Sequence, residues 1–322
     1  MRIAIISDVH GNYPALMAVV EDALSNNVDE FIFTGDYIFN LPFSNEIAQL
    51  IMKLENTHII KGNKELYLAK LANDSQENSV YNQMGGKQFI YRELSVDAFN
   101  FLNALEEEIY IQLNSGIMIY ANHIPKFPVP LYKTNFGSYN FYKKMLAEPF
   151  SHEQYLTEFG KFINKEDNKN FFNQINANVI IFGHNHLQSF AYLDDKLIIN
   201  PGSCGLPFDF NPAAAYTILE VTTDGFNVIE KRVDYDIENT INNVKQSTFY
   251  ENEKIWCDIA FCSLKTGKDY LYGVFLEIVG QIASSKNEEG DWMTCSDAVW
   301  AEAGERFIAE YRVDFLRSPT AE

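Results

Sequence analysis

Two histidines stand two positions apart directly after an apolar run. The stretch reads Gly183-His184-Asn185-His186, and the run 178–182, which is apolar after Asn178, precedes it. A short apolar run that stops at a glycine is typical of a buried strand. Imidazole is a common ligand of transition metals. A strand end that carries two of the six histidines therefore predicts one part of a metal site.

Other apolar runs also end in residues that can bind metals. They are followed by Asp8-Val9-His10, Gly35-Asp36, Gly62-Asn63 and His123. Ligands bind at the carboxyl ends of strands in open α/β sheets, so we expect these strand ends to meet in one crevice. Oxygen ligands mixed with imidazoles suit divalent ions such as Mn, Fe or Zn. Two ions about 3.5–4 Å apart would polarise a phosphoryl group and activate a water, and Asp36 is placed to bridge them.

The elements that must position these residues alternate along the chain. Three predicted strands at residues 2–7, 30–36 and 57–63 are separated by helical patterns at 13–27 and 44–54. This alternation indicates βαβ units and an α/β fold. Further along, we expect the following elements: mostly helix over 64–107, two strands within 108–123 that turn at 114–116, a hairpin over 189–200, and strands at 214–221 and 225–233.

The pattern changes near Asp234, where helical stripes begin. We predict helices within 236–251, 269–283 and 296–311, each with an apolar face. Residues 1–234 would form one domain, and residues 235–322 would form a helical extension. The apolar stripes of an extension need a partner surface, and the first domain is the simplest one.

Composition limits the function classes. The chain has 322 residues, of which 47% are hydrophobic, so it can bury a core. Its net charge of −19 disfavours nucleic-acid coating and binding to anionic membranes. The four cysteines show no paired spacing, and the N-terminus lacks a secretory pattern, so we expect a cytoplasmic protein. The longest apolar stretch is interrupted by Glu277 and is too short to span a bilayer.

The motifs, in this order, resemble those of the calcineurin-like metallophosphoesterases. The resemblance covers about residues 1–233 and rests on five motifs: Asp-x-His, Gly-Asp, Gly-Asn, a lone His and Gly-His-x-His. It implies a four-layer sandwich of two mixed sheets flanked by helices. It also implies a ligand set of Asp8, His10 and His186 for one metal ion, Asn63, His123 and His184 for a second, and Asp36 as the bridge.

Two stretches are similar to a compact bacterial subgroup of that family. They are "SDVHGNYPAL" near the start and "NPGSCGLPF" at residues 200–208. The subgroup includes phosphodiesterases and diadenosine-polyphosphate hydrolases of streptococcal type. The resemblance implies hydrolysis of phosphodiester or phosphoanhydride bonds in a small nucleotide by in-line attack of a metal-bridging hydroxide. The alternatives are a protein or small-molecule phosphomonoesterase, and a non-enzymatic metal-binding scaffold with the same fold.

The chain departs from the family pattern at two positions. Many members have a histidine directly after Gly-Asn, where this chain has Lys64, and some have an aspartate where it has Phe39. The missing histidine would protonate the leaving group, so either Lys64 or Glu65 could take that role. We include Lys64 among the catalytic residues beside Asp36, Asn63 and His123.

Substrate contacts are predicted at three residues. Lys64 and Lys126 could bind phosphate, and Asn12 could either do so or cap the helix that follows it. Residues 123–144 are rich in lysines and aromatics and form either a substrate wall or a packing surface. We expect two transition-metal ions and a small phosphorylated substrate such as a nucleotide. The identity of the metal and the formation of a homo-oligomer stay open.

Overall fold

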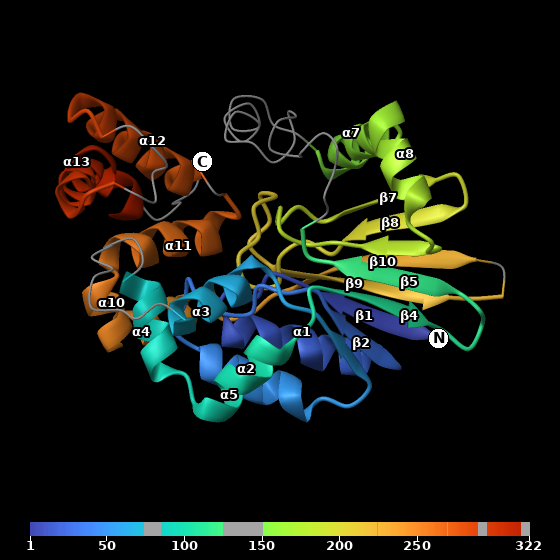
Figure 1. The fold of residues 1–322 in the computed structure, drawn as a ribbon. Helices are drawn as coiled ribbons and strands as arrows, with labels where there is room; N and C mark the ends of the chain where they lie inside the picture. The colour runs from blue at the N-terminus through green and yellow to red at the C-terminus, as the bar shows by residue number, and fades with distance from the viewer. Residues whose placement is uncertain (74–84, 125–150, 224, 269, 289–294, 317–322) are drawn as a thin grey trace.

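The computed structural model describes residues 1–73, 85–124, 151–223, 225–268, 270–288 and 295–316. Two five-stranded sheets pack face to face, and helices cover their outer faces (Figure 1). Further helices, in orange and red, lie at one end of this sandwich. The predicted α/β sandwich with a C-terminal helical extension is therefore confirmed. No described helix is long and apolar enough to cross a membrane.

The first sheet is mixed. Its strand order is β10 (Phe226–Val233), β9 (Ala214–Val221), β1 (Arg2–Ile6), β2 (Glu30–Phe33) and β3 (Thr57–Ile59). Strands β1, β2 and β3 run parallel, whereas β9 is antiparallel to both β1 and β10. A crossover helix returns the chain to the starting edge before each parallel strand. The carboxyl ends of β1, β2 and β3 therefore share one edge.

The second sheet contains two hairpins joined through a parallel centre. Its strand order is β4 (Glu108–Gln112), β5 (Met118–Asn122), β6 (Val179–Ile181), β8 (Lys196–Asn200) and β7 (Ser189–Leu193). β5, β6 and β8 are parallel, and the β4–β5 and β7–β8 pairs are antiparallel. The predicted strands and hairpins of this half are all present.

The central strand β1 is buried on both faces, as expected in a layered α/β fold. In β1, Ile3 and Ile5 belong to the core between the two sheets, whereas Ala4 and Ile6 belong to the core under the outer helices. This alternation follows from the two-residue period of a strand. The four apolar residues that follow Arg2 thus hold β1 between two layers.

Helices cover the outer face of each sheet. Those that share the core of the first sheet are α1 (Tyr13–Ser25), α2 (Ser44–Lys53), α3 (Asn63–Asn73), α4 (Gly85–Glu93) and α5 (Val96–Ala104). Two unpredicted helices, α7 (His152–Ile163) and α8 (Glu166–Gln174), share the core of the second sheet. Their sequence signal is the capping box that Ser151 and Gln154 form at the start of α7.

The described part of the extension contains five helices. They are α9 (Ile237–Lys245), α10 (Thr248–Asn252), α11 (Lys254–Thr266), α12 (Tyr270–Ser285) and α13 (Asp297–Leu316). The prediction of one helix over residues 236–251 is wrong, because the Ser247 side chain accepts a bond from the Tyr250 N–H and starts a new helix. Helix α11 was not predicted.

The extension packs in two layers. Apolar residues of α9, α10 and α11 join the core of the first sheet and its helices, for example Val244 and Leu264. Helices α12 and α13 form a separate cluster with Ile259 and Trp256 of α11. α11 therefore links the sandwich to the outermost helices. The domain boundary at residue 234 stays a prediction.

Candidate metal centre

The seven predicted metal ligands all follow carboxyl ends of strands, and the structure brings them together. Their positions are as follows: Asp8 and His10 after β1, Asp36 after β2, Asn63 after β3, His123 after β5, and His184 and His186 after β6. These strands belong to different sheets, yet their ends meet at one edge of the sandwich. Residues up to 178 positions apart in the chain thus become neighbours.

The backbone is unusually constrained at this edge. Five of the seven residues have a positive φ: Asp8 (54°), His10 (52°), Asp36 (58°), His184 (74°) and His186 (60°). This left-handed conformation is uncommon for residues other than glycine and costs free energy. The rest of the fold must therefore impose it. Such strain is typical of functional sites, where side chains are held in one direction.

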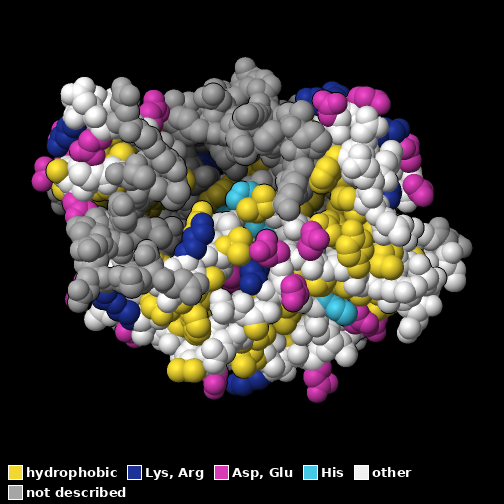
Figure 2. Space-filling view, in the orientation of Figure 1, with side chains coloured by type: hydrophobic (Ala, Val, Ile, Leu, Met, Phe, Trp, Pro, Cys, Tyr) yellow, Lys and Arg dark blue, Asp and Glu magenta, His cyan; other side chains and the backbone are white. Residues whose placement is uncertain are grey.

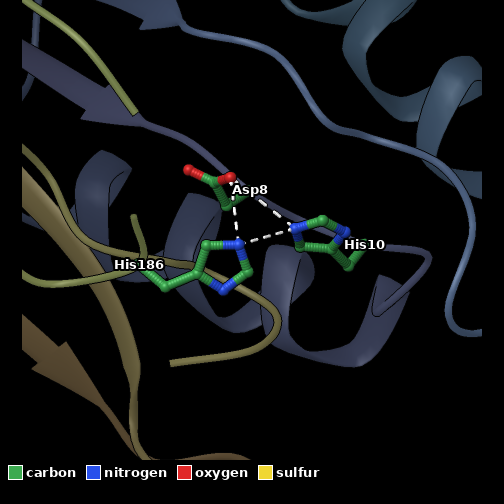
Figure 3. A group of neighbouring side chains, drawn as sticks. All are labelled: Asp8, His10 and His186. Carbon is green, nitrogen blue, oxygen red and sulfur yellow. Dashed lines mark hydrogen bonds and ion pairs between the residues drawn. The ribbon is translucent and has the colours of Figure 1, made fainter. Parts of the chain in front are cut away.

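Asp8, His10 and His186 form the first group of ligand atoms. Figure 3 shows the three side chains pointing toward one another from two loops. Asp8 Oδ1 lies 3.6 Å from His10 Nε2 and 3.3 Å from His186 Nε2. The two imidazole nitrogens are 3.0 Å apart. Two ligands that each lie about 2.0–2.2 Å from one ion are themselves about 3 Å apart, so this spacing fits a shared ion.

Asp36, Asn63, His123 and His184 form the second group. His123 Nε2 lies 3.4 Å from Asp36 Oδ1 and 3.2 Å from Asn63 Oδ1. His184 Nδ1 lies 2.9 Å from the same amide oxygen. The ligand atoms of Asp36, His123 and His184 all lie within 4.8 Å of one another. Asn63 adds an oxygen donor without a further negative charge.

The Asp36 carboxylate lies between the two groups. Its Oδ1 faces His123, and its Oδ2 lies 3.9 Å from His10 Nε2 in the first group. A carboxylate with one oxygen toward each group has the placement of a bridging ligand. The assignment of each residue to a particular ion stays a prediction.

Two backbone carbonyls orient the imidazoles. His123 Nδ1 lies 2.6 Å from the carbonyl oxygen of Thr34, and His186 Nδ1 lies 2.6 Å from that of Leu206. A carbonyl only accepts, so each Nδ1–H donates and each Nε2 turns its lone pair toward the ligand groups. These contacts could not be predicted from sequence, because every residue has a carbonyl whatever its type.

The charges of the site are strongly coupled. Burial lowers the pKa of His10 to about 4. Burial would also lower the pKa of His123, but Asp36 and Asp8 raise it to about 9. Burial opposes ionisation of Asp36 as well, yet His123 and His10 hold the pKa of that carboxyl well below its usual range. Both aspartates are therefore ionised at neutral pH, as metal ligands must be.

The residues present fit divalent metal ions. Asp8 Oδ1 is buried and has no hydrogen-bond partner among the described residues, and three imidazole nitrogens face it within 3.9 Å. A buried carboxylate oxygen without a partner is costly, and a cation at this position would compensate for it. The mixture of carboxylate, amide and imidazole donors suits Mn, Fe or Zn.

Two motif glycines are required by close approach. A Cβ at Gly62 would lie 2.2 Å from Asp36 Oδ1, and a Cβ at Gly183 would lie 2.7 Å from Asp8 Oδ2. Any side chain at either position would therefore displace a predicted ligand. This explains why glycine precedes Asn63 and His184.

Glu65 holds two of the ligand loops together. Its carboxylate accepts hydrogen bonds from the backbone N–H groups of Asp36 (2.9 Å), Tyr37 (2.9 Å) and Gly62 (2.8 Å). The residue is only 1% exposed and does not line the cleft described below. With both oxygens engaged, Glu65 is placed to position these loops. The alternative of Glu65 as the proton donor stays a prediction, which this placement does not favour.

Asn12 is a helix cap. Its side-chain oxygen accepts a bond from the Ala15 N–H, and its amide group donates to the carbonyl of Gly205 and to Tyr235 Oη. The residue is fully buried. No donor of Asn12 is left for a phosphate, so the structure supports the capping interpretation and contradicts the substrate contact.

The two predicted lysines differ. Lys64 lines the cleft beside Asp36 and Asn63, and its backbone N–H donates to Asp36 Oδ1 at 2.8 Å. Lys126 lies outside the described residues, as does most of the predicted substrate wall at 123–144. The role of Lys64 stays a prediction.

The metal-ligand groups lie at one end of a cleft of about 640 Å³, counting its open mouth. Figure 2 shows histidine side chains in a hollow near the middle of one face, next to hydrophobic ones. The cleft is also lined by residues that the sequence did not single out: Asn40, Leu206, Phe208, Trp256, Ile259, Ala260, Ser263 and Tyr272. The Phe208 ring stacks on His186 at 4.2 Å between centroids.

The comparisons with known proteins agree with this fold. The family model of calcineurin-like phosphoesterases matches residues 1–188, which is more than half of the chain. The chain therefore belongs to this family, whose members use divalent metal ions. It is also similar to an uncharacterised protein of Methanocaldococcus jannaschii, with 25% identity over 257 residues that cover 77% of this chain and 94% of that one.

Two solved structures share the architecture. One is a metallophosphoesterase from Sphaerobacter thermophilus, with a TM-score of 0.57 and 20% identity over 83% of this chain and 99% of that one. The other is a hypothetical protein from Pyrococcus horikoshii OT3, with a TM-score of 0.55 and 16% identity over 79% and 97% of the two chains. At these identities the likeness establishes the fold alone.

Proposed function

We propose that this protein is a dinuclear metal-dependent phosphoesterase. The observation that carries the proposal is the pair of ligand groups that converge on Asp36, with Asp8 Oδ1 buried beside them and without a hydrogen bond from any described residue. Asp8, His10 and His186 would hold one ion, and Asn63, His123 and His184 the other. Mn, Fe and Zn suit this donor set, and the ligands alone do not select among them.

The chain would position the reacting groups by means of its own rigid loops. Bound ions would activate the attacking water and neutralise charge on the phosphoryl oxygens. Asp36 would keep the two ions at a fixed separation, because Glu65 and the Lys64 N–H fix its loop and its carboxylate. Among the described residues that line the cleft, Lys64 carries a positive charge. It would contact a phosphate or protonate the leaving group.

We propose a phosphodiester or phosphoanhydride of a small nucleotide as the substrate. The support is the likeness of residues 7–16 and 200–208 to the compact bacterial subgroup, together with a cleft that has a polar and an apolar end. A phosphomonoester is the second candidate within the enzyme class. It is less favoured because Lys64 replaces the family histidine that would protonate the leaving group. A metal-binding scaffold is the non-enzymatic alternative.

We propose that the protein is cytoplasmic, because its four cysteines show no paired spacing. We also propose that its partner is a small phosphorylated molecule. The net charge of −19 supports a site that attracts anions only through bound cations, rather than a surface that coats nucleic acid. A homo-oligomer remains a prediction.

The experiment is hydrolysis of bis(4-nitrophenyl) phosphate by the full-length protein, with and without Mn²⁺, beside Asp36→Ala. We expect turnover that requires metal and is lost in the variant. A substrate panel of 4-nitrophenyl phosphate and small nucleotides would then rank diester, anhydride and monoester. If the wild type binds metal but hydrolyses none of them with Mn²⁺, Fe²⁺ or Zn²⁺, the enzyme proposal is wrong and the scaffold alternative leads.

A further inference from the structure

The cleft has two chemically different ends. One end carries the metal-ligand groups and Lys64, and the other is formed by helices α11 and α12 of the extension. The extension contributes these lining residues: Trp256, Ile259, Ala260, Ser263 and Tyr272. The polar groups of these side chains are the hydroxyls of Ser263 and Tyr272 and the indole N–H of Trp256. The wall lies beyond residues 1–188, which the family model matches, so it is a feature of this chain's own extension.

We infer that this wall determines substrate specificity by binding a flat aromatic group, such as a nucleobase, that is attached to the phosphate. The inference rests on the proposed function, since it assumes that a phosphate lies at the metal-ligand end. It adds the residues that select the organic part of the substrate.

Trp256 is the anchor of this wall. Its ring is held from behind by an aromatic cluster, with centroids 5.6 Å from Tyr272, 5.0 Å from Phe275 and 6.2 Å from Trp300. Phe275 and Trp300 are buried, whereas Trp256 and Tyr272 are partly exposed and border the cleft. A large ring that is fixed on one side and open on the other can stack on a ligand at little cost in side-chain entropy.

Phe208 connects the two ends. It lines the cleft and stacks on His186, with an interplanar angle of 12°. A ligand that contacts the Phe208 ring is therefore separated from the predicted metal ligand His186 only by that ring. A nucleotide lying along the cleft would place its phosphate toward the metal-ligand groups and its base toward Trp256 and Tyr272.

The chemistry of the wall favours a base over a hydrophilic group. Burial of the flat face of a base against apolar and aromatic side chains is favourable. Such stacking is possible for every nucleobase, because each has a π-face. A sugar or glycerol group would desolvate its hydroxyls against the apolar surface of Trp256, Ile259 and Ala260, which offers few hydrogen-bond partners for them. We therefore expect discrimination between phosphates that differ only in the presence of a base.

The test is calorimetric binding of adenosine 5′-phosphate and of ribose 5-phosphate to the full-length protein with saturating Mn²⁺. The two probes share the sugar and the phosphate and differ in the base. We expect the nucleotide to bind about tenfold more tightly. Trp256→Ala should weaken nucleotide binding about tenfold and leave ribose 5-phosphate unchanged, whereas Trp256→Phe should keep most of the difference.

Trp300→Phe is the matched control, because Trp300 belongs to the same aromatic cluster but does not line the cleft. It should not change either affinity, and thermal unfolding identifies any variant whose extension has melted. Equal binding of the two probes by the wild type overturns the inference, whatever the variants do. Turnover of bis(4-nitrophenyl) phosphate in the same preparation shows separately whether the proposed function holds.

Discussion

The two ends of the cleft are built in different ways. The metal-ligand end consists of short loops after five strands, with positive φ at five of its seven predicted ligands and buried carboxylates at Asp8 and Asp36. The other end consists of regular helices, α11 and α12, whose side chains pack in an aromatic and aliphatic cluster. At the metal-ligand end, hydrogen bonds and ion pairs hold a strained backbone in place. Apolar packing holds the other end.

This difference separates chemistry from selectivity. A strained and charged loop edge cannot change without loss of the metal site, because each ligand depends on its neighbours. A helical wall can change side chain by side chain while its backbone stays in place. We therefore expect substitutions at the sheet edge to abolish turnover of every substrate, and substitutions on the wall to alter preference.

The largest effect should come from His123→Ala at the sheet edge. It removes a predicted ligand whose imidazole is fixed by the Thr34 carbonyl, so we expect turnover of all substrates to fall by roughly 10³-fold or more. His58→Ala is the control, since His58 pairs with Glu30 on neighbouring strands outside the site. Steady-state kinetics measure both. A substrate-selective loss in His123→Ala would break the proposed separation.

The second effect is stabilisation by metal. Ligands that bind only the folded state add about 4 kcal/mol to its stability at a thousand times their dissociation constant. We expect urea unfolding midpoints to rise accordingly with Mn²⁺ relative to EDTA. Asp8→Asn keeps the shape but removes the charge, and should lose most of this increase. An equal increase in wild type and variant would place the ion elsewhere.

The third effect is pH dependence of the metal-free protein. The pKa of His10 is lowered to about 4, so its stabilising contribution is complete above pH 6.5 and is lost as the pH falls toward 4. The pKa of His123 is raised to about 9, so its contribution is complete below pH 6.5 and is lost as the pH rises through 9. These two histidines should each remove about 3 kcal/mol of stability at full shift, and His184, whose pKa burial also lowers to about 4, should add to the loss on the acid side.

Urea unfolding across this range in EDTA measures the profile. His10→Gln should reduce the loss on the acid side, to which His184 also contributes, and His123→Gln should reduce the loss on the alkaline side. If the unfolding free energy of a variant depends on pH as in the wild type, another group causes the pH dependence on that side of the profile.

The smallest effect concerns Lys64. If it contacts a substrate phosphate, Lys64→Met should lower kcat/KM for a diester about tenfold, through one lost charge-assisted hydrogen bond. Lys61→Met is the matched control, because Lys61 lies three residues earlier and donates instead to the exposed carbonyl of Asn103. If Lys64→Met lowered kcat/KM only for substrates that carry a base, Lys64 would contact the base and not the phosphate.

Much of the metal-ligand end could be predicted from sequence. A predicted strand followed by a predicted metal ligand occurs five times, and in three cases a glycine precedes the ligand. Parallel strands bring their carboxyl ends to one edge of the sheet. The sequence could not identify the acceptors on Thr34 and Leu206 or the clamp made by Glu65, because their roles depend on loops that meet only in three dimensions. The same limit left the two interpretations of Asn12 undecided.

The extension was predicted less well. Its helical character was visible, but α11 was missed and the helix over 236–251 is broken at Ser247. Apolar positions occur on several sides of α11, because one side packs on the sandwich and another on α12 and α13. A helix that is buried on two sides lacks the single stripe on which sequence reasoning depends.

The sequence by itself determined the fold class, the order of the ligand motifs and the residue types at the metal-ligand end, because these follow from local periodicity and from chemistry that few side chains can perform. Only the tertiary structure decided which carbonyls orient His123 and His186, and which side chains complete the cleft. Phe208, Trp256 and Tyr272 have no special spacing in the chain. They lie together because the helices pack over one end of the sandwich, and packing joins residues without regard to their separation in sequence.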